Sequence, residues 1–235
     1  MSTKDKIVRR LVAQLDLAAG LRESTAQEPA ALSGRRLLRE WQARSLARRH
    51  ADLLESPRFA ATASFFLSDI YGPKDLSRHQ QDVRRVVPIM RKVLPAAGLE
   101  TVADALELNT LSEALDAAMV RALGPGVERL DEAGYGRAYR EVGRRAERER
   151  QIDLVAQLGR SLDHLTRQPF VGKALSLMRK PAVLAGLGEL QDFLERGYAA
   201  FLEMGGAEAF LDLVVARERA VMEALFAGED RPPES

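Results

Sequence analysis

Apolar residues recur at three- and four-residue intervals in almost every segment of this 235-residue chain. That spacing places them on one face of an α-helix, whereas the alternation typical of a strand never persists over about four to eight residues. Leu108, Leu111, Leu115 and Met119 are one such series. The pattern predicts an all-α fold without a sheet, built as a single helical bundle-like domain of about eight or nine helices.

The sequence of the N-terminal third predicts two helices, of which the second has an irregular apolar pattern. The first helix is expected to end by Gly20, and residues 23–31 are expected to connect it to a second helix that runs to about Glu55. Two apolar stripes lie on different sides of that second helix, one containing Trp41 and the other containing Leu53. We therefore expect the second helix to bend or to contact two different neighbours.

The longest uninterrupted apolar pattern runs over residues 135–166 at close to heptad spacing. At about 1.5 Å per residue, one continuous helix over this range would be about 48 Å long, which exceeds what a small core needs. Its middle, RRAERER at 144–150, is rich in arginine. The sequence therefore predicts one long helix that projects from the body or crosses a partner.

The C-terminal part predicts a helical hairpin. Two apolar helical patterns are separated by Gly205-Gly206, a pair suited to a left-handed helix cap. Because so few residues link the two helices, we expect them to pack antiparallel. The domain is predicted to span residues 1–228, and residues 229–235 are predicted to form a disordered tail because they have no apolar side chain to bury.

The most distinctive stretch is FFLSDIYGPKDLSRHQQD, in which a turn beginning at Tyr71 separates two helices. Asp69 and Asp75 flank this turn, and His79 lies in the first turn of the next helix. In the structural interpretation, the two carboxylates accept backbone N–H groups and fix the turn. In the alternative, these four residues bind a ligand, a partner or a hard metal cation. Turn chemistry explains every residue except His79, which favours the structural interpretation and no metal.

His50 is a further candidate binding residue, because it lies in an apolar stripe of the second helix. A haem or metal ligand needs such a position, since imidazole enters an apolar pocket in its neutral form. The alternative is a buried histidine that donates to a carbonyl. No companion ligand motif accompanies His50, so we expect no cofactor. Arg217 and Glu218 lie beside the apolar stripe of the last helix and are expected to include a semi-buried ion pair.

Several function classes are disfavoured by what the sequence lacks. The chain has no cysteine, which excludes a disulfide framework, a thiolate zinc site and a cysteine nucleophile. None of the common phosphate-binding, hydrolase or metalloprotease motifs occurs, and this favours a non-enzymatic protein. A net charge of +1 with scattered arginines argues against nucleic-acid binding. Without a signal peptide or a long apolar run, we expect no membrane span and a cytoplasmic protein.

The stretch FFLSDIYGPKDLSR resembles the FFL-x-D-x-YGP-x-D block of an uncharacterised family of bacterial all-helical proteins. The resemblance extends more weakly through the helix predicted around Val86-Val87-Pro88 and through the predicted C-terminal hairpin. It implies a helical fold and a bacterial source. It implies no activity and transfers no catalytic residue.

Two classes of function fit these observations. The preferred one is a non-enzymatic interaction or scaffold protein that self-associates or binds a protein partner, as the long helix over 135–166 and the many apolar stripes suggest. The alternative is a ligand-, haem- or metal-binding helical bundle, oxygenase-like, with a pocket near His50 and the segment Asp69–His79.

Overall fold

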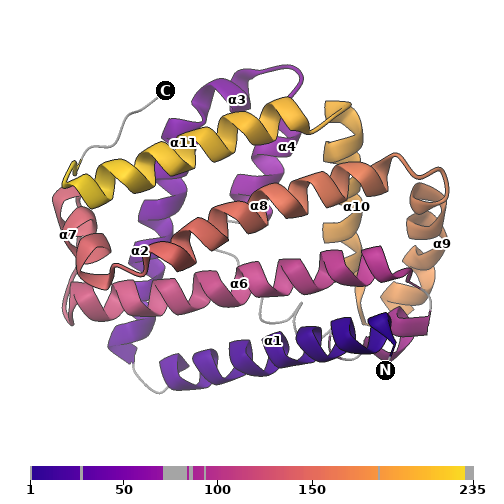
Figure 1. Ribbon diagram of the computed structural model, residues 1–235, viewed down its shortest axis with the longest axis horizontal. Helices are drawn as coiled ribbons and strands as arrows, with labels where there is room; N and C mark the ends of the chain where they lie inside the picture. Colours follow the sequence, from indigo (N-terminus) through magenta and orange to yellow (C-terminus); the bar gives the residue numbers. More distant parts are fainter. Residues whose placement is uncertain are drawn as a thin grey trace.

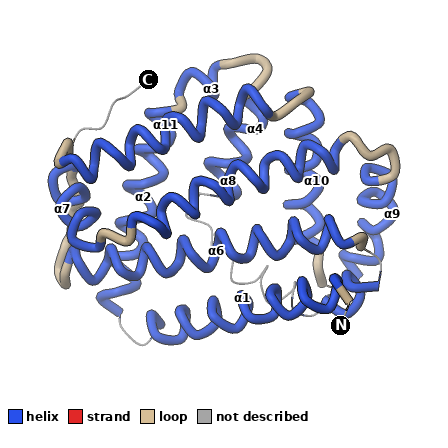
Figure 2. The backbone as a smooth tube through the Cα atoms, in the orientation of Figure 1, coloured by secondary structure: helices blue, strands red, loops and turns tan. Residues whose placement is uncertain are grey.

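The structure is a computed structural model of the chain. It describes residues 2–26, 29–70, 84, 87–92, 94–184 and 186–230. All regular structure within these ranges is helical, and no strand occurs among them (Figure 2). The prediction of an all-α single domain with about eight or nine helices is confirmed for this part of the chain. In the same ranges, no helix has the combination of length and apolar character that crossing a bilayer requires.

Four long helices lie side by side in one layer, which faces the viewer in Figure 1. They are α1 (Thr3–Ala26), α6 (Ala96–Leu123), α8 (Arg145–Thr166) and α11 (Glu208–Ala227). Helices α1 and α6 run parallel, because Arg10 binds Asp104 while the Thr110 hydroxyl donates to the carbonyl of Gln14. Helix α8 runs antiparallel to α6, and α11 runs antiparallel to α8.

A second set of helices crosses behind this layer (Figure 1). It contains α2 (Pro29–Arg49), α3 (Ala51–Glu55), α4 (Ala60–Phe65), the single π-helical turn η1 (Phe66–Ile70) and α10 (Gly188–Met204). Helix α2 packs on α6, and α10 packs on both α4 and α8. The shorter helices α7 (Glu132–Val142) and α9 (Val171–Leu184) lie at opposite ends of the molecule.

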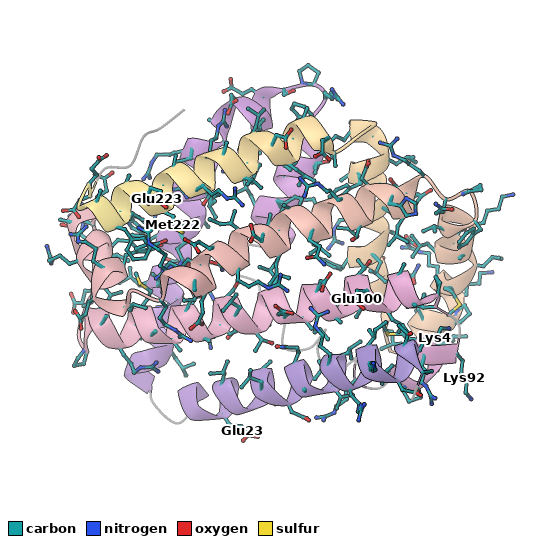
Figure 3. All side chains as sticks on the ribbon, viewed as in Figure 1. Lys4, Glu23, Lys92, Glu100, Met222 and Glu223 are labelled. Carbon is teal, nitrogen blue, oxygen red and sulfur yellow. The ribbon has the colours of Figure 1, made fainter. Side chains whose placement is uncertain are left out.

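Buried apolar side chains gather in separate clusters. One joins α1 to α6, a second joins α4, α8, α10 and α11 around Phe66 and Phe201, and a third joins α2, α7 and α11 around Tyr135. Met222 belongs to the third cluster and is buried, whereas its neighbour Glu223 binds Arg145 at the surface (Figure 3). Between the second and third clusters lies a group of buried polar residues, and the candidate site is built around this group. They are Ser45, Arg49, His50, Asp116 and Arg148.

The N-terminal helices extend further than expected. Helix α1 continues through Gly20, which a helix interior tolerates at a cost of about 1 kcal/mol. Helix α2 begins at Pro29, because proline suits the first turn of a helix. The predicted bend of the second helix is confirmed, since His50 leaves helical geometry with φ −118° and ψ 25° between α2 and α3. Trp41 and Leu53 accordingly join different clusters.

The predicted continuous helix over 135–166 is wrong. Helix α7 ends at Val142 and α8 begins at Arg145, with Gly143 at φ 61° and Arg144 at φ 55° between them. Glycine adopts a positive φ without strain, whereas Arg144 does so with its guanidinium bonded to Glu147. The apolar spacing continues across the break because α7 packs in the third cluster and α8 packs mainly in the second, with Ile152 of α8 against the third. No helix projects here, so this argument for a partner is lost.

The predicted C-terminal hairpin is also wrong, although its helix ends are correct. Gly205 caps α10 in the left-handed region with φ 66°, and Gly206 follows with φ 133°. After these glycines, α11 turns away and lies along α8 and α7, while α10 runs across behind (Figure 1). The antiparallel pair is formed instead by α9 and α10, where the Gln191 side chain donates to the carbonyl of Leu175 at 2.7 Å.

Ordered contacts continue past the predicted domain end at residue 228. The backbone N–H of Glu229 donates to the carbonyl of Ala224, and the Asp230 carboxylate accepts from Arg140 at 2.9 Å. These bonds tie the end of α11 to α7. Residues 231–235 of the predicted tail lie outside the described residues.

Candidate ligand-binding cavity

A cavity of about 320 Å³ lies between the front layer and the crossing helices. Helices α6, α8 and α11 line it from one side, and α2, α4 and η1 line it from the other. Tyr135 and Tyr139 of α7 border it at one end of the molecule, and Phe193 of α10 borders it toward the other. Pockets for small molecules commonly measure about 300–1,000 Å³, so this cavity is large enough for a small ligand.

One half of the cavity is apolar and aromatic. Its lining includes Leu108, Val155 and Leu158 together with Phe66 and Phe210, whose ring centroids lie 5.7 Å apart. All of these side chains belong to the cluster joining α4, α8, α10 and α11. This half offers a ligand dispersion contacts and removal of apolar surface from water.

The other half is polar although it is buried. Helix α2 places Ser45 and Arg49 one turn apart on the same face, and the Arg49 guanidinium donates to the Ser45 hydroxyl at 2.7 Å. Asp116 enters from α6 and Arg148 from α8, and each of these four side chains lines the cavity. Buried polar groups need partners, so the pairing of each one determines what this half can do.

His50, Arg49 and Glu218 form a hydrogen-bonded group. The Glu218 carboxylate lies 3.0 Å from His50 Nε2 and 3.4 Å from Arg49 Nη2. Burial acts to raise the pKa of Glu218, but the bond from His50 and the charge of Arg49 outweigh it, so the pKa lies below its usual value. Arg217 lies 3.4 Å from His50 Nδ1 and binds Asp52 at 2.7 Å. Arg217 and Glu218 are both partly buried and paired, which confirms the prediction made for one of them, but each pairs with other residues.

These contacts bear on the role predicted for His50. Both ring nitrogens face a side-chain partner, so neither is free to ligate a haem or metal ion. The geometry supports the structural interpretation, with the carboxylate of Glu218 in the place of the expected carbonyl. His50 therefore helps to shape the cavity wall.

Arg148 is the exception in the polar half. Its side chain is only 6 % exposed, and its guanidinium lies 3.5 Å from the ring centroid of Tyr139. Its bonding partners are the carbonyl of Gly143 and the sulfur of Met119. Within the described ranges, no carboxylate forms an ion pair with Arg148, whereas Arg39 and Arg49, the other arginines that line the cavity, do have one. Because arginine stays protonated in proteins, the cavity contains a buried positive charge with which no described carboxylate forms an ion pair, although Glu113, Asp116 and Glu218 also line the cavity.

The tyrosines beside Arg148 are hydrogen-bond donors at neutral pH. Burial raises the pKa of both Tyr135 and Tyr139, which keeps their hydroxyl groups protonated. Tyr135 also stacks on Trp41, with ring centroids 3.9 Å apart. This end of the cavity therefore combines a cation with neutral aromatic donors.

Asn109 is a second incompletely bonded group. Its Nδ2 atom is buried, lines the cavity from α6 and has no hydrogen-bond partner in the part of the chain that the structure describes. At about 1.5 Å per residue, it lies about 15 Å along α6 from Met119, which contacts Arg148. The two groups therefore occupy different parts of the cavity.

Sequence reasoning did not identify Arg148 or Asn109. Arg148 lies within the arginine-rich run at 144–150, which we expected to project from the body. Its spacing of four and seven residues from Ile152 and Val155 places it on the buried stripe of α8, and that spacing was the available indication.

The candidate residues of the distinctive turn are not placed. Asp69 belongs to η1, but its side chain lies outside the described residues, as do Tyr71, Asp75 and His79 altogether. Their role in binding stays a prediction. Among the described residues, no three His, Cys, Asp or Glu side chains gather in a way that could hold a metal ion.

The fold and the cavity define an all-helical protein with an internal space of ligand size. Over residues 21–232 the chain matches a domain of unknown function (DUF8198), and it belongs to that family. No curated protein and no solved structure matches it. The family carries no characterised activity, and the bacterial source implied by the resemblance stays a prediction.

Proposed function

We propose that this protein binds a small molecule in its central cavity. The observation that carries the proposal is that one cavity joins an aromatic, apolar half to a buried polar half in which Arg148 has no anionic partner among the described residues. Protein interiors are normally packed with few voids larger than a water molecule. A ligand would fill the space and complete the bonding of the polar groups.

Binding, rather than catalysis, is the activity that these residues support. His50 and Glu218 are engaged with each other, and the tyrosines beside Arg148 have raised pKa values that disfavour a role as bases. The cavity therefore supplies donors and apolar surface, which hold and orient a ligand.

Trp41 allows this proposal to be tested directly. It is the single tryptophan of the chain and it lines the cavity. We expect compounds that bind the cavity to change its fluorescence and to raise the melting temperature. Val214→Phe fills part of the cavity, whereas Val183→Phe adds the same volume on the exposed face of α9.

The matched pair separates cavity binding from surface binding. Compounds found in a screen should bind the parent protein and Val183→Phe, and they should bind Val214→Phe weakly or not at all. Equal binding to both variants, or no response of Trp41 to a chemically diverse set of compounds, would contradict the proposal.

Self-association is a second candidate function, and the surface of α9 favours it. Four apolar side chains on this helix have exposed fractions between 52 and 89 %: Leu177, Met178, Val183 and Leu184. The same helix exposes Lys173 and Lys180, and α10 beside it exposes Asp192. A second copy related by a twofold axis would cover the apolar surface and bring basic and acidic helices together.

The test of self-association is the mass of the protein in solution. We expect light scattering to show a dimer that Leu177→Glu with Leu184→Glu converts to a monomer. Leu17→Glu is the control, because Leu17 is 56 % exposed on a different helix, α1. A parent protein that stays monomeric at high concentration would contradict this function.

A further inference from the structure

The charge at the polar end of the cavity indicates what the ligand carries. Arg148 contacts a carbonyl oxygen, a thioether sulfur and the Tyr139 ring, and none of these bears a negative charge. A thioether is a weak acceptor, and an aromatic ring offsets only part of the cost of burying a cation. An anion placed beside Arg148 would form the charge-assisted bonds that the described residues do not provide.

The number of cations available to a ligand narrows the choice of anion. Arg49 is engaged by Ser45 and Glu218, and Arg39 by Glu113 and Asp116, so Arg148 stands alone as the cation available to the ligand among the cavity's described arginines. A single planar guanidinium matches one planar carboxylate, whereas a doubly charged phosphate normally calls for more than one cation.

The apolar half limits the size of the rest of the ligand. A volume of about 320 Å³ lies at the lower end of the range of about 300–1,000 Å³ that is common for small-molecule pockets. The apolar part of the ligand is therefore expected to be a chain of medium length. The Phe66 and Phe210 rings would surround such a chain.

We infer that the cavity binds a medium-length apolar monocarboxylate, with its carboxylate on Arg148 and its apolar part in the half lined by Phe66 and Phe210. This inference rests on the proposed function, because it assigns a class of ligand to the same cavity. Tyr139 holds the guanidinium plane from one face, so the ligand approaches another edge of the group.

The first experiment needs no variant. Decanoate and decanol have the same number of carbon atoms and differ in the charge of the head group, so each is titrated separately into the parent protein while the fluorescence of Trp41 is recorded. We expect decanoate to bind at least about tenfold more tightly, the factor that corresponds to one charge-assisted hydrogen bond. Equal affinity for the two compounds would overturn the inference.

The second experiment assigns the preference to Arg148. Arg148→Met keeps an unbranched apolar side chain and removes its charge. We expect decanoate to bind this variant about 10–100-fold more weakly, and decanol to bind it with little change. Arg160→Met is the control, because Arg160 lies on the same helix at the surface and pairs with Glu208. Circular dichroism establishes that each variant is folded.

The outcomes separate the inference from the proposed function. If other compounds bind the parent protein and fail to bind Val214→Phe, but decanoate does not bind, the cavity is a ligand site and the carboxylate inference is wrong. If Arg148→Met folds and binds decanoate as the parent does, Arg148 is not the anion-binding residue and the inference is again wrong. If no compound reaches the cavity, the proposed function itself fails.

Discussion

Two groups of polar residues line the same cavity and differ in how their charges are paired. The Glu218 carboxylate bonds to both His50 and Arg49, so a negative and a positive group meet within the protein. Arg148 is also hydrogen-bonded, but it forms no ion pair with a carboxylate among the described residues. A buried ion pair that loses one partner costs stability, and a ligand can supply the missing charge. The comparison favours Arg148, rather than His50, as the group that would meet an anionic ligand, whereas Asn109 Nδ2, which has no described partner, lies in a different part of the cavity.

The largest expected loss of stability comes from disrupting the group formed by His50, Arg49 and Glu218. Glu218→Gln removes the negative charge that faces His50 and Arg49, and we expect the free energy of unfolding to fall by about 3 kcal/mol. Chemical denaturation measures it. The control is Glu223→Gln on the same helix, because Glu223 pairs with Arg145 at the surface and should contribute less than about 1 kcal/mol. Similar losses in the free energy of unfolding for both variants would show that the buried pair contributes no more than the surface pair, and this would contradict the account.

The same pair predicts a dependence on pH. The pKa of Glu218 is lower in the folded protein than in an unfolded chain, because the bond from His50 and the charge of Arg49 outweigh the effect of burial. Its contribution is therefore fully present above the unfolded value of about 4.3 and is lost as pH falls through the lower folded pKa. The stability difference between the parent and Glu218→Gln should shrink below about pH 4. A difference that stays constant down to pH 3 would contradict this assignment.

A smaller effect, of opposite sign, is expected at Asn109. Replacing this side chain with leucine removes a buried amide nitrogen that lacks a partner, so Asn109→Leu should raise the free energy of unfolding by about 1 kcal/mol in the absence of ligand. Thermal and chemical denaturation both measure the change. A clear loss of stability would contradict this prediction, because it would show that the Asn109 amide has a hydrogen-bond partner in solution.

The smallest effect on stability is expected at Arg148, although its effect on binding is large. Arg148→Met gives up a cation–π contact but also removes the cost of a buried charge without an anion, so ligand-free stability should change by less than about 1 kcal/mol. Denaturation of the ligand-free variant measures this. A loss as large as that at Glu218 would make Arg148 part of the structural network.

Periodicity predicted the fold class because every helix places its apolar residues toward a neighbour. It could not predict the break between α7 and α8, since the apolar spacing continues on both sides of Gly143 and Arg144. The direction of α11 also escaped prediction. The Gly205-Gly206 pair marks a helix end, but only the contacts with α8 and α7 decide where the next helix lies.

The candidate site was predictable only in part. The apolar stripe of the second helix correctly placed His50 inside the protein, where it lines the cavity. A ligand site at His50 and the segment Asp69–His79 stays a prediction. Its pairing with Glu218 depends on a contact between residues 168 positions apart, which no local pattern contains. Arg148 was hidden within an arginine-rich run whose other members face the surface, and its environment arises only when α6, α7 and α8 meet.

A crystal structure of the protein with 10-bromodecanoate would test the central claim most directly, because the bromine atom locates the end of the chain by its anomalous scattering. The account predicts the carboxylate at the Arg148 guanidinium and bromine in the half of the cavity lined by Phe66 and Phe210. Bromine found only on the exposed surface of α9, with the cavity empty, would contradict it.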